Sequence, residues 1–153
     1  MHNGRNRAAL PLLLAMLLLP CRALIAQEGS VSQRVQALMT EGRFAEARPI
    51  LEKELRENDL LSDNDRLNML FQLAYSLLEL KEFRPSINTW HEFITFVPEQ
   101  PMIWGNLGWT YYLNGDLDSA IIATDRSLKA DATQAWAWGN MGLYWLAKGD
   151  IEG

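Results

Sequence analysis

The stretch WGNLGWTYYLNGD, residues 104–116, is nearly repeated as WGNMGLYWLAKGD, residues 138–150. Matching residues lie 34 positions apart, as in the pairs Trp104 with Trp138 and Gly108 with Gly142. A fixed period between about 20 and 50 residues is typical of stacked structural units. The spacing therefore indicates a repeat protein, provided that the same period continues elsewhere in the chain.

The period does continue toward the N-terminus. LFQLAYSLLELKEF starts at Leu70, 34 residues before Trp104, and its apolar positions match slot by slot. EGRFAEARPILEKEL, from Glu41, aligns with NGDLDSAIIATDRSL, from Asn114, once five extra residues (SDNDR) are allowed. We therefore predict this organisation: a signal segment 1–26, a degenerate first repeat 27–61, an insertion 62–66, full repeats 67–100 and 101–134, and a partial fourth repeat 135–153.

Each full repeat reads as two helices, and no segment reads as a strand. In the third repeat the large and small apolar residues recur at i, i+3, i+4 and i+7, which lines one face of a helix. Gly115 is placed to end that helix in a left-handed conformation, and Asp116 or Asp118 is placed to cap the next one. The stripes of the two helices are Trp104, Leu107, Gly108, Tyr111 and Ala120, Ile121, Thr124, Leu128.

Small residues are expected where the two helices of a repeat approach closely: Gly108 with Ala120, and Ala74 with Ser86. Ser62 is expected to cap the helix that follows it, with Asp65 three residues on. Pro49 lies several residues into its helical pattern, so we expect it to delay or bend that helix.

The repeats resemble tetratricopeptide repeats, whose pattern is W-x2-L-G-x2-Y, then A-x3-F, then P. The resemblance covers nearly everything after residue 27, although Thr124 and Ala132 replace the usual aromatic residue and proline. It implies an all-α, right-handed superhelical solenoid of stacked antiparallel helix pairs. It also implies a concave surface, made mainly by first helices, that binds a peptide or a partner helix. The residues that carry it are Trp104, Leu107, Gly108, Tyr111, Ala120, Trp90, Pro98, Trp138, Met141, Gly142 and Trp145.

Helical offsets of 3 and 4 place a second stripe on the first helices, distinct from the packing stripe. It is rich in Tyr, Trp and Met, residue types that dominate protein interfaces. The same aromatic residues can instead pack between repeats, and both readings stay open at this point. The stripe has no Lys or Arg, so the basic clamp of some family members is not expected here. The candidate partner-binding residues are Asn68, Tyr75, Met102, Asn106, Trp109, Tyr112, Trp136 and Asn140.

The first 26 residues have a basic start, an apolar run of roughly a dozen residues and small residues at the end, which is typical of a secretory signal. Cleavage after Ala26 or Ala23 fits the pattern. The single cysteine, Cys21, follows Pro20, whereas lipidation sites have a small residue at that place; we read it as lost with the signal. The protein is therefore expected to be exported, to the bacterial periplasm or cell envelope, with a membrane tether as the alternative.

Charge and side-chain chemistry exclude several function classes. Of the 14 basic residues, three (Arg5, Arg7 and Arg22) precede Gln27, so the body carries 11 basic against 19 acidic residues. This acidic balance argues against nucleic acid as a partner. His91 lacks the second histidine of an H-E-x-x-H zinc motif. We predict no catalytic, metal or cofactor site and no small-molecule substrate.

These observations predict a non-catalytic interaction scaffold whose partner is a protein or peptide. The alternative is a docking module of a longer enzyme or envelope component whose active domain lies beyond residue 153. The last helical segment carries Trp138, Met141, Leu143, Trp145 and Leu146, an apolar end that terminal repeats normally avoid. We therefore expect either a longer array or self-association through the C-terminal end.

Overall fold

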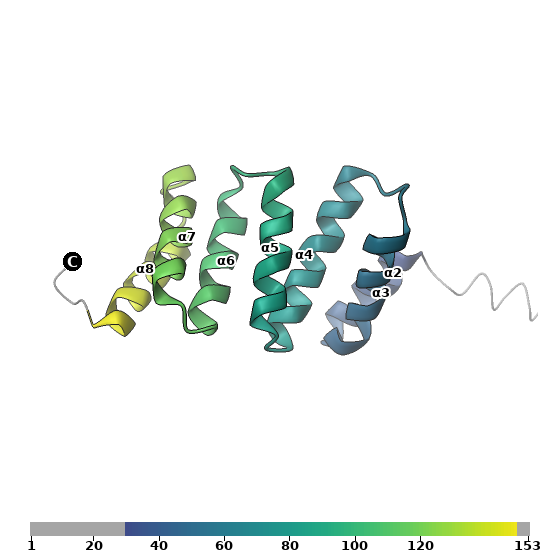
Figure 1. The fold of residues 1–153 in the computed structure, drawn as a ribbon, viewed down its shortest axis with the longest axis horizontal. Coiled ribbons are helices and arrows are strands. Elements are labelled where there is room, and N and C mark those ends of the chain that lie inside the picture. The colour runs from purple at the N-terminus through teal and green to yellow at the C-terminus, as the bar shows by residue number, and fades with distance from the viewer. Residues whose placement is uncertain (1–29, 150–153) are drawn as a thin grey trace, which may run out of the picture. The chain divides into compact units, whose positions relative to one another are not determined.

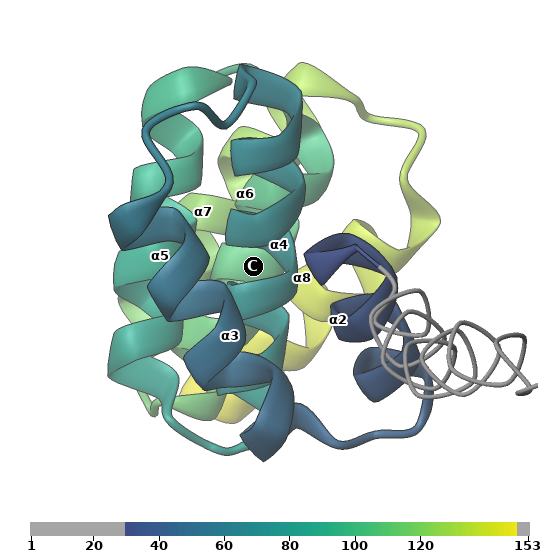
Figure 2. The ribbon, with the colours of Figure 1, turned by 90° about the vertical axis from the view of Figure 1, so that its right-hand side faces the viewer.

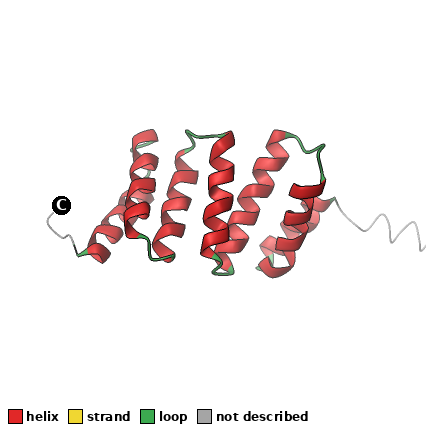
Figure 3. Ribbon diagram, in the orientation of Figure 1, coloured by secondary structure: helices red, strands yellow, loops and turns green. Residues whose placement is uncertain are grey.

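A computed structural model describes residues 30–149, which form helices and connecting turns with no strand in that range (Figures 1 and 3). The predicted signal segment, Cys21 and the last four residues lie outside the described residues. The helices are α2 (Val31–Thr40), α3 (Phe44–Glu57), α4 (Asp63–Glu79), α5 (Phe83–Phe96), α6 (Pro101–Leu113), α7 (Leu117–Ala130) and α8 (Ala135–Lys148).

The chain divides into two compact units, Met1–Ala37 and Leu38–Gly153, and the second contains α3 to α8. Within this second unit each helix packs on the next one in the chain, and α6 also contacts α8. The two views place α4, α6 and α8 in one layer and α3, α5 and α7 in the other (Figures 1 and 2). The all-α prediction of antiparallel helix pairs is confirmed.

The turns inside the helix pairs share one backbone geometry. Gly42, Gly115 and Gly149 have φ of 70°, 84° and 82°, and Lys81 occupies the equivalent place with φ of 61°. At the Lys81 turn the amides of Lys81 and Glu82 donate to the carbonyls of Leu78 and Leu77. The same two-bond pattern closes the Gly42 and Gly115 turns. These bonds satisfy carbonyls that a helix end otherwise leaves open.

Because a side chain in the left-handed region costs about 1–2 kcal/mol, Lys81→Gly is expected to raise the free energy of unfolding by about 1 kcal/mol. The reverse change at the matched turn, Gly115→Ala, is expected to lower it by a similar amount. Urea denaturation of both variants measures the two effects. Equal effects of the same sign would contradict this account of the turns.

The predicted caps are present. The Ser62 hydroxyl accepts a hydrogen bond from the Asp65 amide at 3.1 Å, and Asp116, rather than Asp118, accepts one from the Ser119 amide at 3.1 Å. Residues 63–66 of the predicted insertion form the first turn of α4, which has 17 residues where α6 has 13. The expected delay at Pro49 does not occur. Helix α3 already begins at Phe44, five positions before the proline.

The small residues sit at close helix contacts, as predicted. The Ser86 hydroxyl donates to the Ala74 carbonyl at 2.7 Å, which ties α5 to α4. A methyl group built on Gly108 would lie 2.3 Å from the Thr124 hydroxyl and 3.1 Å from the Ala120 carbonyl oxygen. The core between these contacts consists of Leu70, Ala74, Ile87, Trp90, Phe93, Ile103, Leu107 and Ala123.

Candidate partner-binding face

Six of the eight sequence-predicted residues lie on two helices of the same layer. Met102, Asn106, Trp109 and Tyr112 belong to α6, and Trp136 and Asn140 belong to α8. We call these six residues the α6–α8 face. Met102 and Trp136 are exposed, and the other four are half-buried. All six are thus reachable from solvent while each is partly held by the fold.

Aromatic rings connect the two helices at one end of this face. The Trp109 and Tyr112 rings lie 5.4 Å apart, and Tyr112 stacks on Tyr144 of α8 with centroids 4.9 Å apart and planes 25° from parallel. Offset-stacked pairs at such distances add about 0.5–1.5 kcal/mol to simple burial. The Tyr112 ring is therefore held in place, with its remaining surface available for contact.

At the other end the ring of Trp136 lies against the backbone of α6. A methyl group built on Gly105 would overlap the outer ring atoms of Trp136. The indole nevertheless keeps 43% of its surface exposed. Both interpretations that the sequence left open, packing between repeats and partner binding, therefore apply to Trp136. One side of its ring packs on the neighbouring repeat and the other faces solvent.

Tyr144 is the residue of this region that the sequence reasoning missed. It is fully buried, and its ring supports Tyr112 from below the face. The repeat contained the necessary signal: Tyr144 is 34 residues after Thr110, which is 34 residues after Ser76, and both of those side chains are also fully buried. The 34-residue period, followed along this buried position, therefore indicates that Tyr144 is also buried.

Asn68 and Tyr75 lie apart from the other six, on α4. Tyr75 makes an edge contact with Phe44 of α3 at 5.8 Å instead of joining the Trp109 cluster. Burial raises the pKa of Tyr75, and the nearby carboxylate of Glu79 raises it further. This end of the predicted stripe is thus more acidic than the α6–α8 face.

The α6–α8 face is uncharged. Helix α6 has no ionisable acidic or basic side chain, and α8 has only Lys148, whose ammonium pairs with Asp118 at 3.0 Å. Within residues 30–149 the carboxamides of Asn106 and Asn140 make no hydrogen bond. Each carboxamide has two donor hydrogens and an acceptor oxygen. The face therefore offers aromatic rings and neutral hydrogen-bonding groups.

A buried polar chain ties this face to the core. The Trp90 indole N–H donates to the Thr110 hydroxyl at 3.2 Å, and that hydroxyl donates to the backbone carbonyl of Asn106 at 2.8 Å. The Trp90–Thr110 bond fixes α5 to α6 one helical turn from Asn106. The face is consequently built on rigid helices rather than on loops, which favours precise contacts.

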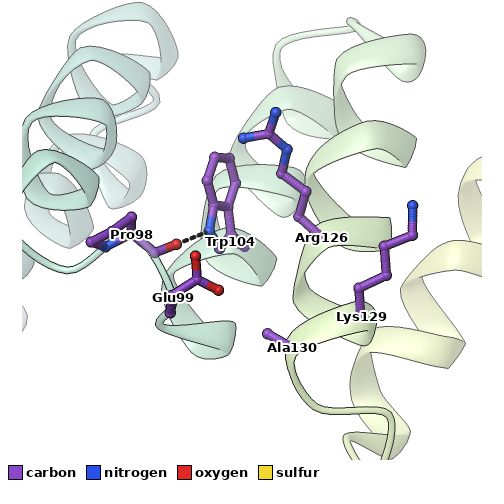
Figure 4. Close-up of a pocket in the computed structure, with 6 residues that line it drawn as sticks. All are labelled: Pro98, Glu99, Trp104, Arg126, Lys129 and Ala130. Carbon is purple, nitrogen blue, oxygen red and sulfur yellow. Dashed lines mark hydrogen bonds between the residues drawn. The ribbon is translucent and has the colours of Figure 1, made fainter.

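A cavity of about 320 Å³ lies elsewhere, between the α5–α6 loop and α7 (Figure 4). The Trp104 indole N–H donates to the Pro98 carbonyl at 2.6 Å, and the Arg126 guanidinium lies 4.6 Å from the centre of the Trp104 ring. Lys129, also in the lining, pairs with Asp125 at 2.6 Å. Glu99 also lines the cavity, so its negative charge offsets the positive charge of Arg126. We infer that these contacts hold the α5–α6 loop against α7.

The described residues contain no cluster of three His, Cys, Asp or Glu side chains that could hold a metal ion. His91 is exposed, and its Nε2 lies 2.8 Å from the Tyr111 hydroxyl. None of the helices between residues 30 and 149 is long and apolar enough to cross a bilayer.

The outer face of α8 is apolar and open. Trp138 and Leu146 are 56% and 62% exposed, and a methyl group on Gly142 would meet no atom within 4 Å. The equivalent residue of α6, Gly108, is covered by α7. The Trp138 indole N–H donates to the Ala132 carbonyl at 2.9 Å, as Trp104 does to Pro98 one period earlier. Within residues 30–149, no helix covers this face of α8 in the way that α7 covers the equivalent face of α6.

Alkaline pH is expected to destabilise the fold through Tyr144. Burial raises the pKa of this phenol to about 12, from an ordinary value of 10.0. Above pH 10 the unfolded chain loses the proton while the folded chain retains it, so stability is full below pH 10 and falls as pH rises to about 12. The loss is at most about 3 kcal/mol. Urea unfolding across this range measures it.

Tyr144→Phe keeps the ring and removes the titrating group, so its stability is expected to fall less steeply over the same range. Burial also raises the pKa of Tyr111 and Tyr75, and a smaller alkaline loss will remain in the variant. An unchanged slope in Tyr144→Phe would show that the alkaline effect arises elsewhere.

Comparison with known proteins gives the fold. No family model matches the sequence, and no curated protein matches it. Among solved structures, MamA from residue 41 to its end, from Desulfovibrio magneticus RS-1, superposes with a TM-score of 0.69 at 19% identity, covering 78% of this chain and 65% of that one. The chain thus spans slightly less than two thirds of that MamA structure.

Two further structures agree. A crystal structure of MamA gives a TM-score of 0.70 at 19% identity, over 84% of this chain and 74% of the other. The first TPR domain of Spaghetti (RPAP3), bound to the HSP90 peptide SRMEEVD, gives 0.68 at 13% identity, over 78% of this chain and 90% of that one. Together with the helix pairs and the 34-residue period, these likenesses show that the chain has a TPR-like fold, a solenoid of helical repeats.

Proposed function

We propose that this protein is an exported, non-catalytic scaffold that binds a segment of a partner protein on the α6–α8 face. The observation that carries the proposal is the concentration of accessible aromatic side chains on this uncharged surface, held by contacts to Tyr144, Gly105 and the core. Side chains that are pre-positioned in this way lose little entropy on binding. A similar fold, the RPAP3 domain, is known with a bound peptide.

The test is a photo-crosslinking amino acid at Tyr112 of the full chain in its native host, with mass spectrometry of the adducts. The matched control is the same group at Ile122, which is 60% exposed on α7. We expect a recurrent partner from position 112 that is absent from position 122. Identical adduct patterns at the two positions would refute a specific partner-binding face.

Export is part of the proposal and rests on the basic, apolar and small-residue pattern of residues 1–26. Cleavage after Ala26 or Ala23 would leave a mature protein beginning at Gln27 or Leu24. Intact mass of the protein from the host envelope decides between these sites and a retained or lipidated N-terminus. Recovery of the uncleaved chain from the cytoplasm would refute export.

The open α8 face supports a second proposal, self-association through the C-terminal end. Four large apolar side chains, Trp138, Leu143, Trp145 and Leu146, are at least 36% exposed on one helix. Exposed apolar groups of this extent mark interaction surfaces. We expect the purified chain to sediment as a concentration-dependent oligomer that Leu146→Glu returns to a monomer. A monomer at all concentrations would exclude self-association.

A further inference from the structure

We infer that the partner segment is an extended, apolar peptide stretch without acidic residues, and that its binding is nearly independent of salt. The inference rests on the proposed function of the α6–α8 face and specifies the chemistry of its partner. It is carried by three features of that face: the absence of charge, the unpaired asparagine carboxamides and the aromatic rings between them.

The first feature selects against acidic partners. The chain as a whole is 22% charged, yet Pro101–Leu113 contains no charged residue and the only charge of α8, Lys148, is already paired with Asp118. A carboxylate brought to this surface would lose water without gaining a cation, which is costly.

The second feature selects an extended segment over a helix. Asn106 and Asn140 stand at equivalent positions of successive repeats, half-buried, with carboxamides that no described residue satisfies. The backbone of a helix is hydrogen-bonded internally, whereas an extended peptide has free N–H and C=O groups. Two carboxamides on neighbouring helices can pair with these groups, and such bonds carry no net charge.

The third feature supplies the affinity. Met102 and Trp136 keep 46% and 43% of their surfaces exposed, and Trp109 and Tyr112 present partly covered rings. Apolar side chains of an extended peptide alternate in direction, so every second one can contact these rings while its backbone faces the asparagines. Binding driven by apolar burial and neutral hydrogen bonds is not screened by ions.

The experiment is isothermal titration calorimetry of the full chain with short blocked peptides of about ten residues. The peptides share Leu and Phe at alternate positions and carry Ser, Lys or Glu between them. Titrations run from about 50 to about 500 mM NaCl, a range over which the screening length falls severalfold. The acidic peptide SRMEEVD, known in complex with the similar RPAP3 domain, serves as the fourth probe.

We expect the Ser and Lys peptides to bind with a Kd that changes less than about twofold across this salt range, and the Glu peptide to bind at least about tenfold more weakly. No binding of SRMEEVD is expected. Tight binding of the Glu peptide or SRMEEVD, weakening with salt, would overturn the inference.

Variants locate the binding. Trp109→Ala is expected to weaken the Ser peptide at least about tenfold, and Asn106→Ala about fivefold, the loss of one neutral hydrogen bond. Asn88→Ala, on exposed α5 surface, is the matched control and is expected to have no effect. Equal effects of Asn88→Ala and Asn106→Ala would refute the assigned face. Circular dichroism of each variant excludes unfolding as the cause.

The isosteric change Asn106→Asp gives an independent readout. It places one negative charge on the face, so the Lys peptide is expected to bind more tightly and to become salt-sensitive, while the Ser peptide weakens. If no peptide binds but the Tyr112 crosslinker captures a specific partner, the inferred partner chemistry is wrong and the scaffold function stands. If both experiments fail, the proposed function fails with it.

Discussion

Trp90→Ala is expected to lower the free energy of unfolding by about 3–5 kcal/mol, the largest single effect in this fold. Trp90 is fully buried, its ring makes edge contacts with Phe71 at 5.5 Å and Phe93 at 6.4 Å, and its N–H bonds the Thr110 hydroxyl. The substitution opens a cavity between α4, α5 and α6 and leaves a buried hydroxyl with one partner fewer. Both effects add to the loss of apolar burial.

Urea denaturation followed by circular dichroism measures this change. The matched control is Phe96→Ala on the same helix, where 43% of the side chain is exposed and the expected loss is about 1 kcal/mol. Trp90→Phe separates the effect of the cavity from that of the lost hydrogen bond, since it keeps much of the side-chain volume and removes the N–H donor. A loss for Trp90→Ala no larger than that for Phe96→Ala would show that the helices do not pack as described.

The second large effect is a pair of substitutions with opposite signs. Gly108→Ala is expected to destabilise the protein by about 1–3 kcal/mol, because the new methyl group meets the Thr124 hydroxyl at 2.3 Å and the Ala120 carbonyl at 3.1 Å. Gly142→Ala, at the same repeat position, meets no atom within 4 Å. It is expected to stabilise α8 by about 1 kcal/mol, the ordinary gain of alanine over glycine in a helix.

The difference between these two variants depends on the covering helix and not on the local sequence, which is nearly identical around both glycines. Thermal or urea unfolding of the two variants measures it. If Gly142→Ala also destabilised the protein, this glycine would be covered in solution, by a further helix of a longer array or by another molecule. The pair therefore reports on the α8 face as well as on repeat packing.

Much of the fold could be predicted because it is built from short-range patterns. The 3.6-residue periodicity of Trp104, Leu107 and Tyr111, the turn glycine Gly115 and the cap Ser62 act over a few residues, and the 34-residue period repeats them. Lys81 shows the strength of the repeat: it takes the left-handed conformation of the matched glycines, although its side chain disfavours that conformation.

Other features depend on which side chains meet from different repeats. Tyr144 becomes a buried support for Tyr112, and Trp136 folds its ring over Gly105, whereas Tyr75 turns to Phe44 and leaves the cluster. These outcomes depend on rotamers and on contacts between residues some 30 positions apart in sequence. Helical spacing identifies the side of a helix on which a residue lies, but only packing determines its neighbour.

The sequence by itself determined the repeat, the helix pairs, the close contacts at small residues and the absence of charge on α6, since each is a property of residue type and spacing. Only the tertiary structure decided that six of the predicted residues form one face, that the carboxamides of Asn106 and Asn140 make no hydrogen bond within the described residues, and that α7 covers Gly108 while Gly142 is open. The physical reason is that the burial of a residue and its hydrogen bonds depend on its neighbours in space. Those neighbours are determined only when all the helices have packed.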